Sequence, residues 1–282
     1  LKNKFQKKYY DTELIQNLLS KKKFNINTVA IFAEFVNFSP WINKYKIENK
    51  NLKIIHFPHT TNIFGSKKIK YTNKLNFEKK NLFLSNAYDI YFWKKKFPNT
   101  NIIETGYLKY DKVWINKIIN KKNKKTKKII YLSLSGFVKE KHDYNKYIKQ
   151  VKDIMDICAE IPDVKIIIKS HPTTNELELE KILSLYSNKK WKLVNDNQLN
   201  LIHISDICVA LFSSASILDF LSMNKIPIEL WDVTKNKKNK SKFSKLNLSL
   251  FVKNKNDFKK KLISLLYKKK NNMRKINIKD NF

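Results

Sequence analysis

The sequence predicts an α/β protein built on parallel β-sheets. In the second half of the chain, short apolar segments alternate with longer segments of helical periodicity, and strands that alternate with helices pair in parallel. Two of these segments, 164–170 and 206–212, contain uninterrupted apolar runs at 166–168 and 207–212. Such runs are typical of strands that helices cover on both faces. We therefore expect a Rossmann-like domain in the second half and another α/β domain in the first.

The first half is predicted to hold a helix and four strands. Residues 1–23 place apolar side chains at helical spacing, which indicates an amphipathic helix. Helical or irregular pieces such as 89–97 separate the later segments. The four short apolar runs that we interpret as strands are 28–35, 52–57, 81–85 and 101–106.

A run of lysine and asparagine at 116–128 is the best candidate for a linker by composition. It divides the chain into two predicted domains, 1–120 and 121–282. A solvated helix end followed by a loop fits the same composition.

The second half continues with a regular alternation of elements. A capping box at 173–176 marks the start of a helix that ends near Tyr186, and 235–245 reads as a basic loop. The strands are predicted at 128–135, 164–170, 191–195, 206–212, 225–231 and 248–252. The other helices are predicted at 143–160, 198–203, 214–223 and 255–270.

The strong positive charge suggests a nucleic-acid partner, but the near absence of arginine argues against one. The formal charge is +34, from 58 Lys+Arg against 24 Asp+Glu, but Arg274 is the only arginine. Arginine is the usual reader of guanine and the bidentate phosphate ligand. Abundant Lys, Asn and Ile with scarce Gly is what an AT-rich coding sequence produces. Spread-out lysines suit a weak attraction to an anionic membrane surface better.

The cellular compartment is predicted from the cysteines and from the absence of a predicted membrane span and signal peptide. Cys158 and Cys208 lie in apolar surroundings, as small core residues of a reducing compartment do. The longest apolar region, 204–223, contains two aspartates and several serines, so no membrane span is predicted. No signal peptide is visible. We expect a cytoplasmic protein, or one peripheral on the inner face of the membrane; because the chain starts at Leu1, it can be a fragment.

Three hydroxyl side chains, Ser213, Ser214 and Ser216, lie where a predicted strand turns into a helix. Ligands of parallel α/β sheets bind outside the carboxyl ends of the strands. The first turn of a helix leaves N–H groups unpaired and carries a positive partial charge. Together these features indicate a phosphate site. The alternative is an ordinary serine N-cap.

His171, followed by Pro172, ends a neighbouring predicted strand and would donate to the same phosphate if protonated. Alternatively it caps the next helix or packs in a loop. Two such features at the ends of one sheet favour function over coincidence. Lys169 can assist, although a lysine at a strand end is more often solvated.

The segments KIIIKSHP, ISDICVALFSSASILDF and KIPIELWD, in that order, resemble the C-terminal half of GT-B transferases that build bacterial surface polymers. The CDP-glycerol glycerophosphotransferases have the most similar pattern, and capsular Kdo transferases and bacterial polysialyltransferases share the HP and SS pairs. The resemblance implies that His171, Ser213 and Ser214 hold the donor's phosphates. Asp219 matches the family's aspartate and equally fits a structural residue of the helix.

The N-terminal half resembles the same group more loosely, in residues 56–68 and 104–114. The residues that match are His59, Gly106, Tyr107 and Asp111. The departures are Thr60, Leu108, Lys109 and the segment 131–137, which lacks the family's Trp and Arg. The departures leave a sugar and a polyol phosphate both open as the transferred group.

The resemblance implies a GT-B-like enzyme with two Rossmann-like domains whose parallel sheets face a cleft, with 1–120 on the acceptor side and 121–282 binding the donor nucleotide. The acceptor hydroxyl loses a proton as it attacks, and a neutral imidazole suits this task, so His59 is the candidate base and Glu34 the alternative. The phosphate site stabilises the leaving nucleotide. His56 and His59 have no third ligand nearby, and no dinucleotide or P-loop motif occurs, so we predict no metal and no cofactor.

We therefore predict a metal-independent transferase. Its donor is a nucleotide-activated, CMP- or CDP-linked sugar or polyol, and its acceptor is a surface polysaccharide or its lipid-linked primer. The cytidine base rests on the resemblance alone. The alternatives are a nucleotide-sugar epimerase on the same fold, and a basic nucleic-acid-binding or membrane-binding protein.

Overall fold

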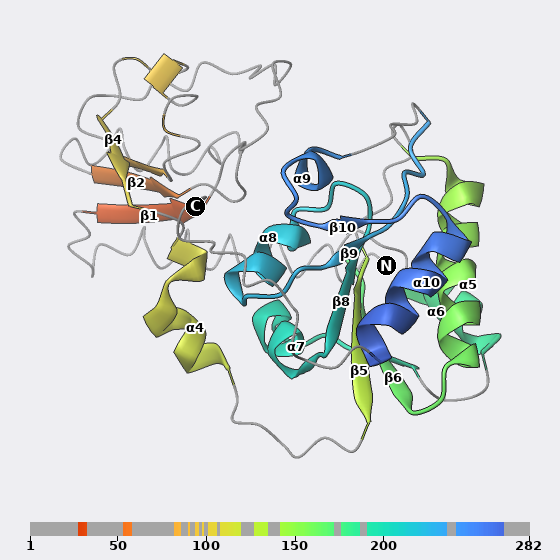
Figure 1. Ribbon diagram of the computed structural model, residues 1–282. Coiled ribbons are helices and arrows are strands. Elements are labelled where there is room, and N and C mark those ends of the chain that lie inside the picture. Colours follow the sequence, from red (N-terminus) through yellow and green to blue (C-terminus); the bar gives the residue numbers. More distant parts are fainter. Residues whose placement is uncertain are drawn as a thin grey trace. The chain divides into compact units, whose positions relative to one another are not determined.

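Figure 1 shows the computed structural model of the chain, which divides into two compact units, Leu1–Leu108 and Lys109–Phe282. The domain boundary predicted between 120 and 121 lies outside the described residues and stays a prediction. The structure describes residues 28–32, 53–57, 82–85, 90, 94–95, 98, 101–105, 108–119, 127–134, 142–171, 176–186, 191–235 and 241–267.

The first unit contains one four-stranded parallel sheet in the order β1-β2-β3-β4. The four strands predicted in this half are confirmed, and the helix predicted within 1–23 lies outside the described residues. Each strand pairs with the next one in the sequence, so the chain crosses the sheet in one direction. The strands are β1 (Thr28–Phe32), β2 (Lys53–Phe57), β3 (Leu82–Ser85) and β4 (Asn101–Glu104).

The second unit contains a six-stranded parallel sheet in the order β10-β9-β8-β5-β6-β7. The chain first runs outward from β5 to β7, then returns to the other side of β5 and runs outward again. This is the Rossmann order, and its direction switches between β5 and β8. The strands are β5 (Lys128–Ser133), β6 (Val164–Lys169), β7 (Trp191–Leu193), β8 (Ile207–Ala210), β9 (Ile228–Glu229) and β10 (Leu250–Phe251).

The predicted helices of the second half are confirmed, and the structure adds three helical segments that were not predicted, 108–110, 112–118 and 242–245. The segment 235–245, expected to be a loop, contains the short helix α9, which begins after Ser241 because the hydroxyl of that residue accepts from the Ser244 N–H at 3.0 Å. The helical elements are η1 (Leu108–Tyr110), α4 (Lys112–Ile118), α5 (Tyr144–Glu160), α6 (Glu176–Ser184), α7 (Gln198–Ile204), α8 (Ser216–Ser222), α9 (Lys242–Lys245) and α10 (Lys255–Tyr267).

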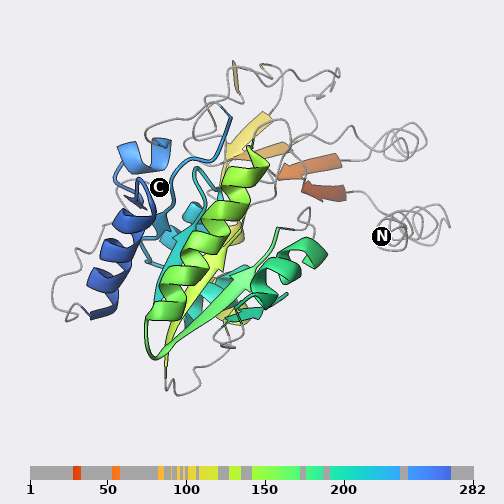
Figure 2. The ribbon, with the colours of Figure 1, turned by 90° about the vertical axis from the view of Figure 1, so that its right-hand side faces the viewer.

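Helices cover both faces of the second sheet, with α5, α6 and α10 on one face and α7 and α8 on the other (Figures 1 and 2). Alternate residues of the strands serve the two faces. Leu132 packs into the apolar core beneath α5 and α10, whereas the neighbouring Tyr131 meets Phe220 of α8 edge to face, with ring centroids 5.7 Å apart. The continuous apolar strands predicted from the sequence therefore have their expected cause.

The two cysteines are buried and free, as predicted. Burial raises the pKa of Cys158 to about 12, so its thiol stays protonated at neutral pH. Over the part of the chain that the structure describes, no helix has both the length and the apolar character to cross a bilayer.

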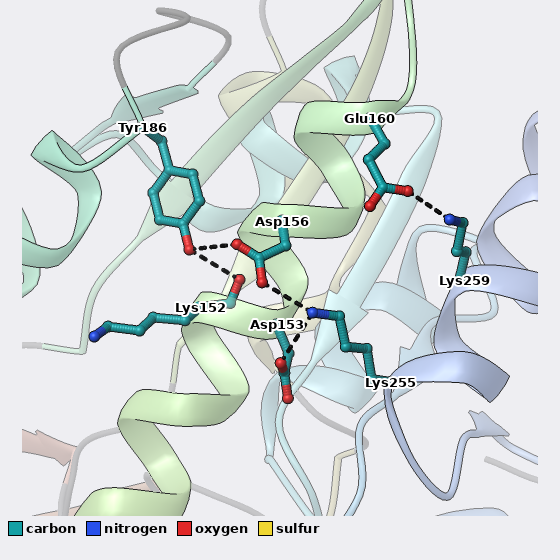
Figure 3. A network of polar contacts seen from close by, with 7 residues as sticks. All are labelled: Lys152, Asp153, Asp156, Glu160, Tyr186, Lys255 and Lys259. Atoms are coloured by element: carbon teal, nitrogen blue, oxygen red, sulfur yellow. Dashed lines mark hydrogen bonds and ion pairs between the residues drawn. The ribbon is translucent and has the colours of Figure 1, made fainter.

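A surface network joins α5 to α10 (Figure 3). Lys255 pairs with Asp153 at 3.2 Å and with Asp156 at 2.9 Å, and Lys259 pairs with Glu160. Tyr186 donates its hydroxyl proton to Asp156 at 2.8 Å. These charges lie at the rim of the apolar core, where water screens them.

Candidate functional site

At the carboxyl edge of the second sheet, four strand residues lie side by side on the face covered by α7 and α8. Strand register places Lys169 of β6, Ser133 of β5, Ala210 of β8 and Glu229 of β9 side by side. The two central members have small side chains, and they flank the point between β5 and β8 where the direction of the sheet switches. In doubly wound sheets this point forms the ligand crevice.

The turn after β8 bends sharply at Ser213. This residue has a φ of 53°, in the left-handed region that costs a non-glycine residue roughly 1–2 kcal/mol. Its N–H donates to the Glu229 carboxylate at 2.8 Å. Ser213 itself is exposed. Its amide therefore points toward the buried Glu229, while the residue as a whole remains accessible to solvent.

The hydroxyls of Ser214 and Ser216 lie 2.8 Å apart, and Ser216 is buried while Ser214 is half-buried. The N-cap of α8 is Ala215, which makes no side-chain cap hydrogen bond. Only a long contact, 3.4 Å from the Ser216 N–H to the Ser214 hydroxyl, resembles capping. The arrangement therefore differs from the ordinary serine N-cap that the sequence left open.

His171 follows β6 at the same edge of the sheet, and β5 lies between it and the Ser213 turn. Two strand spacings make about 10 Å, a gap that two side chains with a diphosphate between them can bridge. The residue is exposed, and partial desolvation lowers the pKa of His171 below its ordinary value of 6.5. The imidazole is therefore neutral at pH 7 until an anion binds. The Lys169 ammonium donates to the carbonyl of Asp196.

Two further predicted residues have identified partners within the second unit. Asp219 on α8 is 3% exposed, accepts from the Tyr110 hydroxyl at 2.9 Å and pairs with Lys109 at 2.6 Å. Asp111 is the N-cap of α4, where its carboxylate accepts from two backbone N–H groups of the first turn. The contacts of both residues hold η1 and α4 in place.

The remaining predicted residues, Glu34, His59, Gly106 and Tyr107, lie outside the described residues. In contrast, sequence reasoning passed over Glu229, which is fully buried at the end of β9 and touches the Ser213 turn. The available signal was an acidic residue inside the apolar run KIPIELW, because a charge in a covered parallel strand needs a partner.

No family model and no curated protein sequence matches the chain. Solved structures do. UDP-GlcNAc 2-epimerase of Methanocaldococcus jannaschii, in complex with UDP-GlcNAc and UDP, is 16% identical with a TM-score of 0.53, over 93% of this chain and 74% of that one. MnaA of S. aureus with UDP is 13% identical with a TM-score of 0.58, over 91% and 69%.

A putative UDP-N-acetylglucosamine 2-epimerase from Listeria monocytogenes is 12% identical with a TM-score of 0.57, over 90% of this chain and 68% of that one. At such identities the likeness concerns the fold. The chain has an α/β fold of parallel sheets with alternating helices, and its solved neighbours have the Rossmann-like build of GT-B proteins, as predicted. The finer resemblance to CDP-glycerol transferases stays a prediction.

Proposed function

We propose that the chain is a transferase that moves a sugar or a polyol phosphate from a nucleotide-activated donor to a cell-surface polysaccharide or teichoic-acid-like acceptor. One observation carries the proposal: the Ser213 turn and His171 lie at one edge of a Rossmann-ordered sheet, on either side of its switch point. Neighbours of the same fold were solved with UDP or UDP-GlcNAc, which supports a nucleotide as the ligand.

In this proposal the donor's phosphates lie against the hydroxyls of Ser213 and Ser214, with His171 on the far side of β5. Negative charge grows on the nucleotide as it leaves, and donors held in place beforehand stabilise that charge without reorganising. His171 binds as a neutral donor or takes up a proton from solvent, and the phosphate charge favours the second course. The hydroxyl of buried Ser216 holds the Ser214 hydroxyl in place through their 2.8 Å contact.

The remaining roles continue the sequence-based prediction. His59 acts as the base toward the acceptor hydroxyl, with Glu34 as the alternative, and Gly106 belongs to the donor side. Lys169, Asp111 and Asp219 act on the donor only if they exchange their present partners. We propose that the reaction needs neither metal nor cofactor; turnover in excess chelator tests this, and its loss would contradict it.

Isothermal titration with CMP, CDP and UDP tests the nucleotide site. We expect one of them to bind, and Ser213→Ala with Ser214→Ala to weaken it by at least about 10-fold, since a hydrogen bond to a charged group contributes roughly 1.5–3 kcal/mol. Ser184→Ala is the matched control, because this α6 serine bonds only its own helix carbonyl at 2.8 Å. The proposal fails if no nucleotide binds and DNA binds tightly with strong salt dependence.

A nucleotide-sugar epimerase is the second candidate, because three solved neighbours are described as 2-epimerases of UDP-GlcNAc or bind UDP on the same fold. An epimerase changes its substrate without an acceptor, whereas a transferase needs one. NMR of the nucleotide sugar incubated with the protein alone separates them. A new stereoisomer without acceptor would replace the transferase proposal.

We also propose that the protein associates with an anionic membrane surface through α4. Val113 and Trp114 on this helix are 64% and 52% exposed. The sequence that follows, from 117 to 128, holds seven lysines and no acidic residue. Exposed apolar side chains beside lysines suit an anionic lipid interface, where each lysine contributes about 1 kcal/mol.

Sedimentation with phosphatidylglycerol vesicles, compared with phosphatidylcholine vesicles, measures this association. Replacing Val113 and Trp114 together by serine should release the protein from the anionic vesicles. Leu177 on α6 is 65% exposed, so Leu177→Ser is the matched control that should stay bound. Equal loss in both proteins would mean that α4 is not the contact.

A further inference from the structure

Glu229 is a carboxylate without access to solvent. Its residue is 0% exposed, at the carboxyl end of β9, on the side of the sheet that faces α8. A buried charge is costly unless several hydrogen bonds replace its water. The complete burial also excludes direct contact with a substrate, so any functional effect of Glu229 passes through its partners.

Three donors from three separate segments converge on this carboxylate. The Ser213 N–H donates to one oxygen at 2.8 Å. The Ser241 hydroxyl donates to the other oxygen at 2.8 Å, and so does the Ser249 hydroxyl. Ser241 caps α9 and Ser249 directly precedes β10. The carboxylate therefore connects the turn after β8 to the last part of the sheet.

The bond to Ser213 differs in kind from the other two. Ser241 and Ser249 contribute side chains, whereas Ser213 contributes the backbone N–H of a residue in the left-handed region. This backbone conformation is uncommon outside glycine, and it persists where its surroundings hold it. An acceptor in a rigid strand below the turn is such a surrounding.

We propose that Glu229 is a positioning residue for the phosphate site: by accepting the Ser213 N–H, it holds the turn so that the Ser213 and Ser214 hydroxyls face the ligand. This inference rests on the proposed function. Without the acceptor, the turn relaxes out of the left-handed conformation, and the Ser213 and Ser214 hydroxyls lose their fixed positions.

Nucleotide titration of three variants tests the proposal, with whichever of CDP or UDP the unmodified chain binds. Glu229→Ala should weaken affinity by about 10-fold or more. Glu229→Gln keeps an oxygen for the Ser213 N–H and should recover most of that loss. Ser241→Ala removes a different bond of the same carboxylate; it should lower the melting temperature and change affinity by less than about 2-fold.

A second variant covers the case in which Glu229→Ala does not fold. The triple change Glu229→Met, Ser241→Ala and Ser249→Ala replaces the buried polar cluster by apolar groups, which is often tolerated when all partners change together. It leaves two backbone N–H groups without their acceptors, that of Ser213 and that of Ser244 in the first turn of α9. We expect a folded protein with the same loss of affinity as Glu229→Ala.

Hydrogen exchange of the Ser213 amide provides a readout that needs no ligand. It should be slow in the unmodified chain and in Ser241→Ala, and at least about 10-fold faster in Glu229→Ala and in the triple variant. Unchanged exchange and affinity in those two variants would overturn the proposal, as would an equal loss of affinity in Ser241→Ala. If the unmodified chain binds no nucleotide, the proposed function fails, while exchange still decides whether Glu229 holds the turn.

Discussion

The two faces of the second sheet bury very different chemistry. Beneath α5, α6 and α10 the core is almost entirely apolar, apart from the buried Gln150 amide that donates to the Trp231 carbonyl at 2.7 Å, and charges such as Lys255 and Asp156 stay at the rim (Figure 3). Beneath α8, two carboxylates are buried: Asp219 is 3% exposed and Glu229 is 0% exposed. Both lie near the Ser213 turn, one on the helix that follows it and one bonded to it.

The difference separates buried groups that mainly stabilise the fold from buried groups that fix the conformation of the proposed site. Apolar burial stabilises at little risk, because it needs no specific partner. A buried carboxylate makes a net gain only with several well-placed donors, and it specifies geometry more than it adds stability. The α5 face accordingly contributes apolar packing, whereas the α8 face combines apolar packing, such as Tyr131 against Phe220, with contacts that hold a particular loop conformation.

Phe258→Ala should have the largest effect on stability, because this α10 side chain is fully buried in the apolar core. Deleting a buried phenyl ring costs about 3–5 kcal/mol. Thermal unfolding measures the loss, and titration at a temperature where the variant stays folded should show unchanged nucleotide affinity. A large loss of nucleotide affinity in the folded variant would mean that the apolar core beneath α5 and α10 also determines the phosphate site.

Asp219→Ala should have the next largest effect, about 1–3 kcal/mol, because it leaves Tyr110 and Lys109 without their common acceptor. Chemical denaturation of the single variants and of the double variant with Tyr110→Phe gives their coupling energy. Because the Tyr110 hydroxyl donates directly to Asp219, the double variant should lose less stability than the two single variants added together. Full additivity would mean that the 2.9 Å contact contributes nothing to stability.

His171→Gln should change the pH dependence of nucleotide affinity. Desolvation lowers the pKa of His171 in the free protein, and a bound phosphate raises it, so binding takes up a proton. Affinity of the unmodified chain should therefore strengthen as the pH falls from 8 toward 6, by up to about 10-fold. The glutamine variant keeps only the titration of the nucleotide itself; equal slopes in both proteins would exclude a proton on His171.

Lys255→Met should have the smallest effect, about 0.2–1 kcal/mol, since Lys255 and Asp156 are more than a third exposed and only its second partner, Asp153, is less so at 16%. The hydrogen bond from Lys255 lowers the pKa of Asp156 below 3.8, so its contribution is present above that pH and is lost in acid. The bond raises the pKa of Lys255 above 10.5, so the contribution is present below that pH and is lost in stronger alkali.

Denaturation at pH 2.5, 7 and 11.5 measures this window. The difference between the unmodified chain and Lys255→Met should be greatest at pH 7 and should shrink at both ends and in high salt. A difference that is independent of pH would mean that the aliphatic stem of Lys255 stabilises α10, not its charge.

The strands and the parallel sheet covered on both faces were accessible from periodicity alone, whereas the order of the strands came only from the structure. Segments such as 164–170 and 206–212 can be buried only in a sheet covered on both faces, and the alternation with helices makes that sheet parallel. The hydroxyls at 213–216 and His171 were found for the same reason, since the carboxyl ends of such strands meet at one edge. Helix α9 was missed because a four-residue helix between lysines has no apolar period.

The amino-acid order alone determined which faces are apolar, where strands end and which hydroxyls follow them, because these depend on neighbours along the chain. It could not show that Asp219 meets Tyr110 across 109 residues of sequence, nor that Ser213, Ser241 and Ser249 converge on Glu229. Those contacts come from segments that only the packed sheet brings together. The direction of the Ser213 amide depends on these tertiary contacts.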